Sequence, residues 1–350
     1  MGPKCQAVRA PILAAMRQIV ITRHGPPEVM RASDAPEPVP RAGEVRIAVR
    51  ASGVNFADVA ARLGVYPDAP PFPCVVGYEV AGVVEQAPDA DGLVPGQRVA
   101  ALTRFGGYAE TVAVPAAQVF PLPDGLSFEQ GAAIPVNYLT AVLMLRHFGN
   151  VQPGDRVLVH AAAGGVGMAA IQLCRAAGAE VIGTASASKH AVLREHGVAH
   201  AIDYRTEDFE QAVKRITGGR GVDVVLDATG AFRKSYRCLA PLGRLVCFGF
   251  SAAASGMTPN RLAALPKLLA LPWFHPVQLM NANKAVAGVH IGRLIDRMDL
   301  LTQELTEVLA LWAAGSVTPR IDASYPFAKA ADAHRRILSH GNTGKIILTP

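Results

Sequence analysis

The sequence predicts a two-domain α/β protein in which a doubly wound parallel sheet is joined to a barrel-like antiparallel domain. Three observations lead to this prediction. Short strands separated by Pro and Gly fill residues 16–125, strands and helices alternate over residues 126–292, and residues 293–350 have too little core of their own to fold alone. We therefore expect the last segment to return to the first, which makes the barrel-like domain discontinuous. A chain of 350 residues, 50% of them hydrophobic, is long enough for both domains.

Residues 1–15 precede the first predicted strand. They hold two prolines and no clean apolar stretch, so we predict a disordered extension rather than a secretory signal. From residue 16 to residue 125, apolar runs alternate with turn residues, and this pattern is typical of short antiparallel strands. The predicted strands span residues 19–22, 44–51, 77–85, 98–101 and 109–114.

Residues 126–292 show the alternation expected of βαβ units, which indicates a parallel sheet covered by helices. The predicted strands span residues 157–160, 181–184, 201–203, 222–227, 244–248 and 285–290. The chain then continues with a helix over 300–314, an extended segment at 319–321, a helix over 327–338 and a last strand over 345–348.

A strand, a glycine-rich turn and a helix follow one another in the run Arg156-Val-Leu-Val-His-Ala-Ala-Ala-Gly-Gly-Val-Gly167. In the G-x-G-x-x-G pattern, Ala162 takes the first glycine position, and Gly164 and Gly167 take the other two. Small residues let the backbone approach a pyrophosphate, and the free N–H groups at the start of the helix attract its charge. A second strand follows at βαβ spacing, so the run predicts a dinucleotide site of the Rossmann type. The residues assigned to this contact are Ala163, Gly164, Gly165, Val166 and Gly167.

The end of the second strand indicates which dinucleotide binds. An NAD site places an acidic residue about 20 residues after the glycines, where it accepts hydrogen bonds from the ribose 2′-hydroxyl. Here Thr184-Ala-Ser-Ala-Ser-Lys189 offers hydroxyl groups and one ammonium, and the first acidic residue is Glu195. An ammonium attracts a 2′-phosphate that a carboxylate would repel, so we predict NADPH; the alternative is that Lys189 merely caps a solvated helix. The further predicted cofactor contacts are Thr184, Ser186, Lys189, Tyr204, Phe248, Gly249 and Ser251.

Composition limits the other classes of function. The net charge of +6 comes from scattered Lys and Arg residues, and attraction of an anionic cofactor explains it better than nucleic-acid binding does. Five widely spaced cysteines without a Cys-x-x-Cys pair predict free thiols in a reducing, cytoplasmic setting. Apolar runs stay below the ~18 residues expected of a membrane-spanning helix.

Several short motifs outside the glycine-rich run have the form found in one enzyme superfamily. They are Gly77-Tyr-Glu-Val-Ala-Gly-Val-Val84, Pro95-Gly-Gln-Arg-Val99, Gln152-Pro-Gly-Asp155, Gly53-Val-Asn-Phe-Ala-Asp58, Val136-Asn-Tyr-Leu-Thr-Ala141, Gly183-Thr-Ala-Ser-Ala-Ser-Lys-His190 and Ala282-Asn-Lys-Ala-Val286. With them the chain resembles the medium-chain dehydrogenase/reductase superfamily, within it the zinc-free quinone oxidoreductases, and among these the vesicle amine transport protein branch. The resemblance covers residues 17–350 and implies a Rossmann domain and a discontinuous GroES-like barrel.

Zinc-dependent members of this superfamily hold the metal with thiolate, imidazole and carboxylate groups. By the resemblance, Asn55 stands at the place of the first catalytic cysteine and Tyr78 at that of the histidine, which leaves Glu79 without partners. His196 and His200 fall near a helix end of the cofactor domain, where surface positions are expected. We therefore predict that the chain holds no catalytic zinc.

Reduction of an activated C=C bond is a hydride transfer that needs no metal. The predicted acceptor is a quinone or an α,β-unsaturated carbonyl, whose developing enolate needs a hydrogen-bond donor and a proton. The resemblance implies that Asn55, Tyr66 and Thr140 line the nicotinamide cleft. Asn55 and Thr140 would orient the carboxamide or the substrate oxygen, and Tyr66 would form an aromatic wall or donate a hydrogen bond. Two alternatives stay open, namely that Tyr66 is a surface turn residue and that Thr140 bonds its own helix backbone.

The insertion over residues 251–282 is unusually apolar for a segment that follows a Rossmann strand. Its run 262–274 contains two prolines and one lysine, so a lid or a subunit interface is favoured over contact with a membrane surface. The insertion keeps a second function open, in which an NADPH-binding protein of the vesicle amine transport type acts mainly through lipid or protein binding. The apolar strand predicted at 285–290 has an exposed edge, and pairing of this edge about a twofold axis predicts a homodimer, which the family resemblance also implies.

Overall fold

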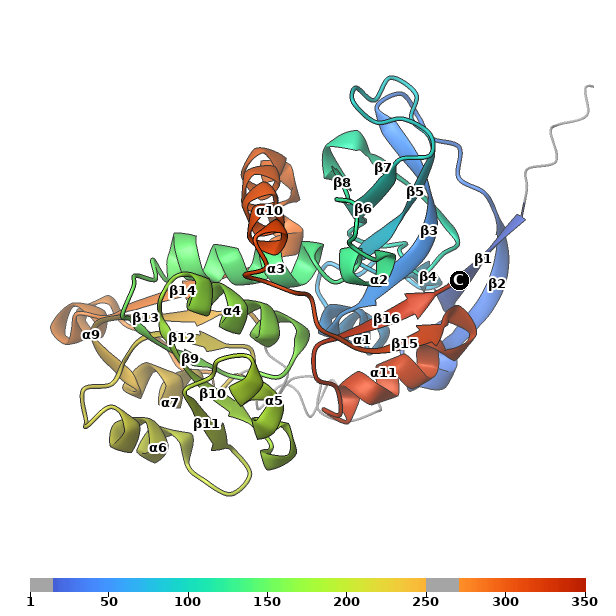
Figure 1. Ribbon diagram of the computed structural model, residues 1–350. Coiled ribbons are helices and arrows are strands. Elements are labelled where there is room, and N and C mark those ends of the chain that lie inside the picture. Colours follow the sequence, from blue (N-terminus) through green and yellow to red (C-terminus); the bar gives the residue numbers. More distant parts are fainter. Residues whose placement is uncertain (1–14, 250–270) are drawn as a thin grey trace, which may run out of the picture.

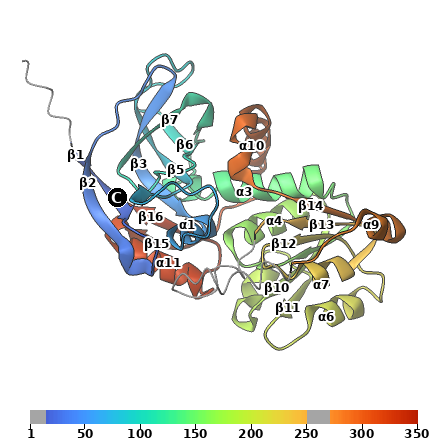
Figure 2. The same ribbon diagram turned by 180° about the vertical axis from the view of Figure 1, so that it is seen from behind.

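The computed structural model describes residues 15–249 and 271–350. Figure 1 shows two units, a parallel sheet flanked by helices and an antiparallel sheet with short helices around it, and Figure 2 shows the same units from behind. This architecture confirms the predicted fold class. The N-terminal extension except residue 15, the predicted contact Ser251 and the insertion as far as residue 270 lie outside the described residues.

The parallel sheet forms the first unit, here called the parallel-sheet unit. Its strands are β9 (Arg156–Val159), β10 (Glu180–Ala185), β11 (His200–Asp203), β12 (Val222–Asp227), β13 (Leu239–Cys247) and β14 (Ala285–Gly288). They lie in the order β11-β10-β9-β12-β13-β14, and every neighbouring pair is parallel. All six carboxyl ends therefore meet at one edge of the sheet. The helices of this unit are α4 (Gly165–Ala176), α5 (His190–Glu195), α6 (Phe209–Ile216), α7 (Phe232–Arg237) and α9 (Pro276–Ala282).

The second unit, here called the barrel unit, is mostly antiparallel. Its main strands are β3 (Glu44–Val54), β5 (Glu79–Gln86), β6 (Arg98–Leu102), β7 (Thr111–Pro115), β8 (Val119–Pro121), β15 (Ile321–Pro326) and β16 (Lys345–Thr349). They form one sheet in the order β15-β16-β3-β5-β6-β8, with β7 paired to β3. Because β16 pairs with β3, the end of the described chain completes a sheet begun near its start (Figure 1).

A separate three-stranded sheet covers the barrel unit and differs most from the prediction. Its strands are β1 (Ala15–Ile21), β2 (Met30–Pro36) and β4 (Cys74–Val75), in the order β2-β1-β4. β1 begins earlier than predicted, and β2 was not predicted at all. The residues over 31–34 are exposed, so β2 has no alternation of apolar and polar positions, and it forms because its backbone pairs along all of β1.

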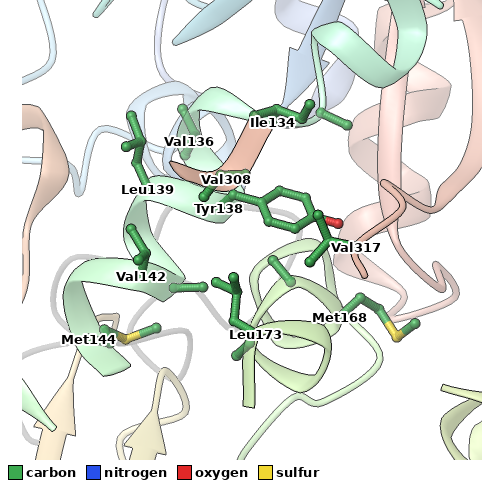
Figure 3. Close-up of a cluster of buried hydrophobic side chains, with 14 of the residues drawn as sticks. Ile134, Val136, Tyr138, Leu139, Val142, Met144, Met168, Leu173, Val308 and Val317 are labelled. Carbon is green, nitrogen blue, oxygen red and sulfur yellow. The ribbon is translucent and has the colours of Figure 1, made fainter. Parts of the chain in front are cut away.

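A hydrophobic cluster surrounds α3 (Pro135–Val142), which continues into the π-helical segment η3 (Leu143–Phe148). Every residue of α3 is buried, because the helix packs against α4 and α10 (Met298–Ala313). Figure 3 shows Tyr138 and Leu139 of α3 near Leu173 of α4 and Val308 of α10. The helix α10 therefore packs against α3.

Three short helices complete the barrel unit, namely α1 (Phe56–Arg62), α2 (Phe128–Gly131) and α11 (Ala330–Leu338). α11 packs against β16 and α1, so it holds the returning segment in place. Among the helices of the described ranges, none is both long and apolar enough to cross a membrane.

Candidate active site

The glycine-rich run forms the turn between β9 and α4, at the carboxyl edge of the parallel sheet. Ala161 adopts a left-handed conformation with φ of 50°, and Gly164 precedes the first helical residue, Gly165. A Cβ atom at Gly167 would lie 2.5 Å from the Ala162 carbonyl oxygen, which is closer than a side chain tolerates. The third glycine of the pattern thus lets the helix pack against the turn, as a dinucleotide site requires.

Other predicted cofactor contacts lie at the same edge because the parallel strands end there. They are Thr184 at the end of β10, Ser186 just beyond it, Tyr204 after β11, and Phe248 and Gly249 after β13. Thr184 is buried, and its hydroxyl lies 3.0 Å from His160 Nδ1, so this side chain stabilises the protein interior. Tyr204 is exposed, and the Arg205 guanidinium lies 5.9 Å from the centre of its ring.

Lys189 follows β10 at the end of the short helix η4 (Ala187–Lys189). Its Nζ donates to the carbonyl oxygens of His340 at 2.7 Å and Asn342 at 2.6 Å, which belong to the loop before β16. Burial lowers the pKa of Lys189, and the charge of Asp322 opposes this effect. The alternative of a lysine that merely caps a solvated helix does not fit these contacts.

The loop over residues 340–344 connects the barrel unit to the glycine-rich turn. Gly344 donates its N–H to the Ala163 carbonyl at 2.8 Å. Its φ is 97°, and a Cβ atom there would lie 2.3 Å from the Arg320 carbonyl oxygen, so the position requires glycine. Together with the contacts of Lys189, this hydrogen bond holds the loop beside the carboxyl edge of the parallel sheet.

A buried polar cluster lies where β3 ends and α1 begins. Asn55 donates from Nδ2 to Glu79 Oε1 at 3.0 Å and accepts on Oδ1 from Lys345 Nζ at 2.6 Å. Lys345 also pairs with Glu79 Oε1, and Glu79 Oε2 accepts the Val136 N–H at 2.7 Å. The side chains of Glu79 and Lys345 are 0% and 2% exposed, so this ion pair is shielded from solvent.

The cluster changes the interpretation of two predicted positions. Glu79 does not lack partners, because it is the anion of a buried ion pair and accepts three hydrogen bonds. The amide of Asn55 is engaged at both ends inside the protein. The contact predicted between Asn55 and a carboxamide or a substrate oxygen stays a prediction, because Asn55 could make this contact only if the hydrogen bonds of the cluster opened. In the structure described here, Asn55 positions Lys345 and Glu79.

A second buried chain of hydrogen bonds begins at Asp58, whose Oδ2 accepts the Asn55 N–H at 2.7 Å. The Tyr108 hydroxyl donates to the same oxygen at 3.2 Å and lies 3.2 Å from His334 Nε2, while Arg62 Nε donates to His334 Nδ1 at 3.3 Å. Burial raises the pKa of Asp58 to about 7, against the effect of its hydrogen-bond donors. Burial also lowers the pKa of His334 to about 3, so this ring is neutral at ordinary pH.

The two shifted groups predict opposite dependences of stability on pH. Asp58 has a raised pKa in the folded state, so its contribution is present below about pH 4 and is lost as the pH rises toward 7. His334 has a lowered pKa, so its contribution is lost as the pH falls below about 6.5. We expect His334→Gln to make stability fall more steeply with rising pH than in the unmodified protein, by up to about 1.4 kcal/mol per pH unit between about pH 4 and 6.5. Urea unfolding at several pH values measures this slope. If stability changed with pH in the same way in the two proteins, His334 would not have a lowered pKa in the folded state.

Tyr66 lies in the loop after α1 and is half-buried. Its ring packs edge-on against Tyr78, with centroids 5.9 Å apart, and its hydroxyl lies 2.9 Å from His290 Nε2. Thr140 is buried on α3, and within residues 15–249 and 271–350 its hydroxyl has no hydrogen-bond partner, unlike Thr217, which bonds its own helix. Neither alternative drawn from the sequence, a surface tyrosine or a threonine bonded to its own helix, fits these positions.

Sequence reasoning missed three residues of this region. Lys345 is the one charge in the apolar strand β16, and Asn137 is an amide in the apolar helix α3, where its Oδ1 lies 3.5 Å from Lys345 Nζ. An isolated polar group in a buried run needs a partner, so both positions carried a usable signal. The sequence around His290 carried no such signal, because the contact of His290 is with Tyr66, in a loop far away in the sequence.

Asn55 and Tyr78 are both engaged within the protein, at the positions where zinc-dependent relatives are expected to hold the metal. Across the described ranges, no three His, Cys, Asp or Glu side chains are arranged to hold a metal ion. Cys74, Cys174, Cys238 and Cys247 are free thiols.

Comparison with known proteins places this architecture in a family. The family model of the alcohol dehydrogenase GroES-like domain matches residues 41–124, and that of the zinc-binding dehydrogenases matches residues 196–348. The chain belongs to the medium-chain dehydrogenase/reductase superfamily. It is 42% identical to the synaptic vesicle membrane protein VAT-1 homolog of Rattus norvegicus over 346 residues, which cover 96% of this chain and 84% of that protein.

Two solved structures show which chemistry occurs on similar folds. The quinone oxidoreductase of Escherichia coli, complexed with NADPH, is 31% identical with a TM-score of 0.85, and the match covers 96% of this chain and 100% of that chain. The CurK enoyl reductase is 27% identical with a TM-score of 0.83, and the match covers 95% of this chain and 99% of that chain. The protein thus belongs to a family of oxidoreductases with a nicotinamide cofactor.

Proposed function

We propose that the protein is an NADPH-dependent reductase that transfers hydride to a quinone or an α,β-unsaturated carbonyl without zinc. The observation that carries the proposal is the ammonium of Lys189, which follows β10 where an NAD site would present a carboxylate. The similarity to a quinone oxidoreductase bound to NADPH and to an enoyl reductase supports both the cofactor and the class of acceptor.

The described residues suggest how each part of the reaction is served. Bound NADPH supplies a hydride for the electron-poor carbon of the acceptor. The first turn of α4, from Gly165, holds the pyrophosphate through its free N–H groups, and Lys189 neutralises the 2′-phosphate. The hydroxyl of Thr140, which has no partner among the described residues, would orient the nicotinamide carboxamide. Tyr66 donates a hydrogen bond to the acceptor, where negative charge develops as hydride arrives.

The proposal is tested by following NADPH consumption with a panel of quinones and enones, with products identified by mass spectrometry. We expect turnover with at least one class of acceptor, a clear preference for NADPH over NADH, and no loss of activity after treatment with a chelator. Binding of NADPH without turnover of any acceptor would contradict the proposal, and zinc in stoichiometric amounts would contradict its zinc-free form.

Exposed apolar side chains around α9 favour a second candidate function. Trp273 is 93% exposed and Met280 is 72% exposed, and such residues on a surface commonly mark contact with a partner. The VAT-1 homologs carry the name of a vesicle membrane protein, which agrees with lipid or protein binding. Sedimentation with liposomes, run beside the activity panel, separates the two functions: binding to liposomes without turnover supports the second.

We also propose a homodimer formed through β14. This strand ends the parallel sheet, with β13 on one side and no strand on the other among the described residues. The backbone groups at an unpaired, apolar strand edge can form hydrogen bonds with the same strand of another copy, related by a twofold axis. Light scattering at micromolar concentration should give twice the mass of one chain, and a mass of one chain that does not change on concentration would contradict the dimer.

A further inference from the structure

Tyr66 and His290 form a pair across the boundary between the two units. Tyr66 belongs to the loop after α1 in the barrel unit, and His290 follows β14 in the parallel-sheet unit. The Tyr66 hydroxyl lies 2.9 Å from His290 Nε2, and the two ring centroids are 5.7 Å apart. Asp68 Oδ2 lies 3.7 Å from the same nitrogen. A histidine nitrogen thus lies between a carboxylate and a tyrosine hydroxyl that faces Tyr78.

A carboxylate and a guanidinium lie beside this hydrogen bond. Arg293 holds Asp68 through two contacts, from Nε at 3.1 Å and from a terminal nitrogen at 2.9 Å, and this pairing lowers the pKa of Asp68. In the tautomer that carries its hydrogen on Nε2, His290 donates to the Tyr66 oxygen, and the carboxylate of Asp68 lies 3.7 Å from the same nitrogen. Burial raises the pKa of Tyr66, against the effect of a hydrogen bond with Tyr78, so its own proton stays on the hydroxyl.

We propose that His290 positions Tyr66 and returns a proton to it during enone reduction. This inference rests on the reductase function proposed above. Hydride from the reduced nicotinamide forms a C–H bond at the β-carbon, and the C=C electrons move to give an enolate. The Tyr66 O–H bond breaks as its proton forms a second C–H bond at the α-carbon. When the His290 ring carries a proton on each nitrogen, its Nε2–H bond then breaks to restore the Tyr66 hydroxyl, which leaves a neutral imidazole protonated on Nδ1.

The position of His290 suits this return of protons. Its side chain is 40% exposed, so the imidazole regains its proton from water. The charged and titratable groups around the pair are Asp68, Arg293 and Tyr78, with Arg104 and Asp58 acting at longer range on Tyr66. Tyr66, by contrast, is packed between the rings of Tyr78 and His290. Its hydroxyl therefore lies beside a ring nitrogen of a partly exposed side chain.

The test compares the unmodified protein with His290→Gln, which keeps a hydrogen-bond donor but cannot carry a second proton, and with Tyr66→Phe. For an enone we expect His290→Gln to lower kcat by about 10- to 100-fold while KM changes by less than about twofold. The variant should lose a dependence of kcat on pH that the unmodified protein shows, because glutamine cannot release a proton to Tyr66. Added imidazole should restore part of the rate in His290→Ala, because the site is open to solvent.

A matched control and a readout other than activity complete the design. His200 is also half-exposed and lies 3.6 Å from a carboxylate, that of Glu180, but on the strand at the opposite end of the sheet, so His200→Gln should leave kcat and its pH profile unchanged. Nitrogen-15 NMR of the histidine rings, without cofactor, should show the His290 Nε2 signal shifting in Tyr66→Phe. If the unmodified protein reduces enones and His290→Gln has the same rate and pH profile, the proposed proton transfer from His290 to Tyr66 is wrong, but the reductase function stands. If the unmodified protein does not reduce enones, both this proton transfer and the proposed reduction of enones are wrong.

Discussion

Replacing Lys345 with methionine is expected to lower the free energy of unfolding by about 3–5 kcal/mol. The ammonium of Lys345 is the cation that faces Glu79 in the buried cluster, and both side chains are shielded from water. Methionine has a similar length but no charge, so Lys345→Met leaves the buried Glu79 carboxylate with the hydrogen bonds from Asn55 and Val136 but without its cation. Urea unfolding at neutral pH measures the loss.

Two further variants separate the ion pair from simple packing. In the double variant Glu79→Gln with Lys345→Met, the orphaned charge is removed, and we expect at least half of the lost stability to return. Arg215→Met breaks an exposed ion pair with Glu207 and should change stability by about 0–1 kcal/mol. If Lys345→Met were as mild as this surface variant, the buried ion pair would not stabilise the fold.

Replacing Lys189 with alanine is expected to remove most of a preference for NADPH over NADH that we put at about 10- to 100-fold. The ratio of the two dissociation constants is the informative quantity. Lys189 also binds the carbonyl groups of His340 and Asn342, so its loss loosens the loop for both nucleotides, but only NADPH loses a partner for its 2′-phosphate. Fluorescence titration at low and high salt measures the ratio, and high salt should lower it in the unmodified protein.

Lys284 offers a matched control for this variant. Its Nζ donates to the Tyr236 carbonyl at 3.2 Å, and burial lowers its pKa as it does for Lys189. Lys284→Ala should therefore leave the nucleotide preference unchanged. Equal affinities for NADPH and NADH in the unmodified protein would show that Lys189 does not bind the 2′-phosphate.

Much of the fold could be predicted because its central elements have strong local patterns. β12 was predicted at its observed bounds, and the turn before α4 was predicted from the spacing of its glycines. β2 was missed because it is held by backbone pairing and shows no apolar alternation. The packing of α10 against α3 was also missed, because the sequence gives the amphipathic pattern of a helix but not the surface that it covers.

The residues of the candidate site also divide into those with a local sequence pattern and those whose partners are distant in the sequence. Residues that belong to one continuous motif, such as Gly164 and Lys189, could be predicted as site residues from their spacing alone. The environment of Asn55 could not be predicted, because its two partners, Glu79 and Lys345, belong to β5 and β16, which are distant in the sequence. The contact of Tyr66 with His290 likewise joins two units that only the folded chain brings together.

The pairing of β16 with β3 has a consequence for how the chain is made. Gly53 lies opposite Ile347, so translation must proceed through nearly the whole described chain before this edge of β3 gains its partner. The six-stranded sheet needs no residue beyond β14 for its own ladder, so it is able to form while synthesis continues. Gly344 can reach Ala163 only after this last segment has been made, so the nascent protein has its glycine-rich turn before it has the loop beside that turn.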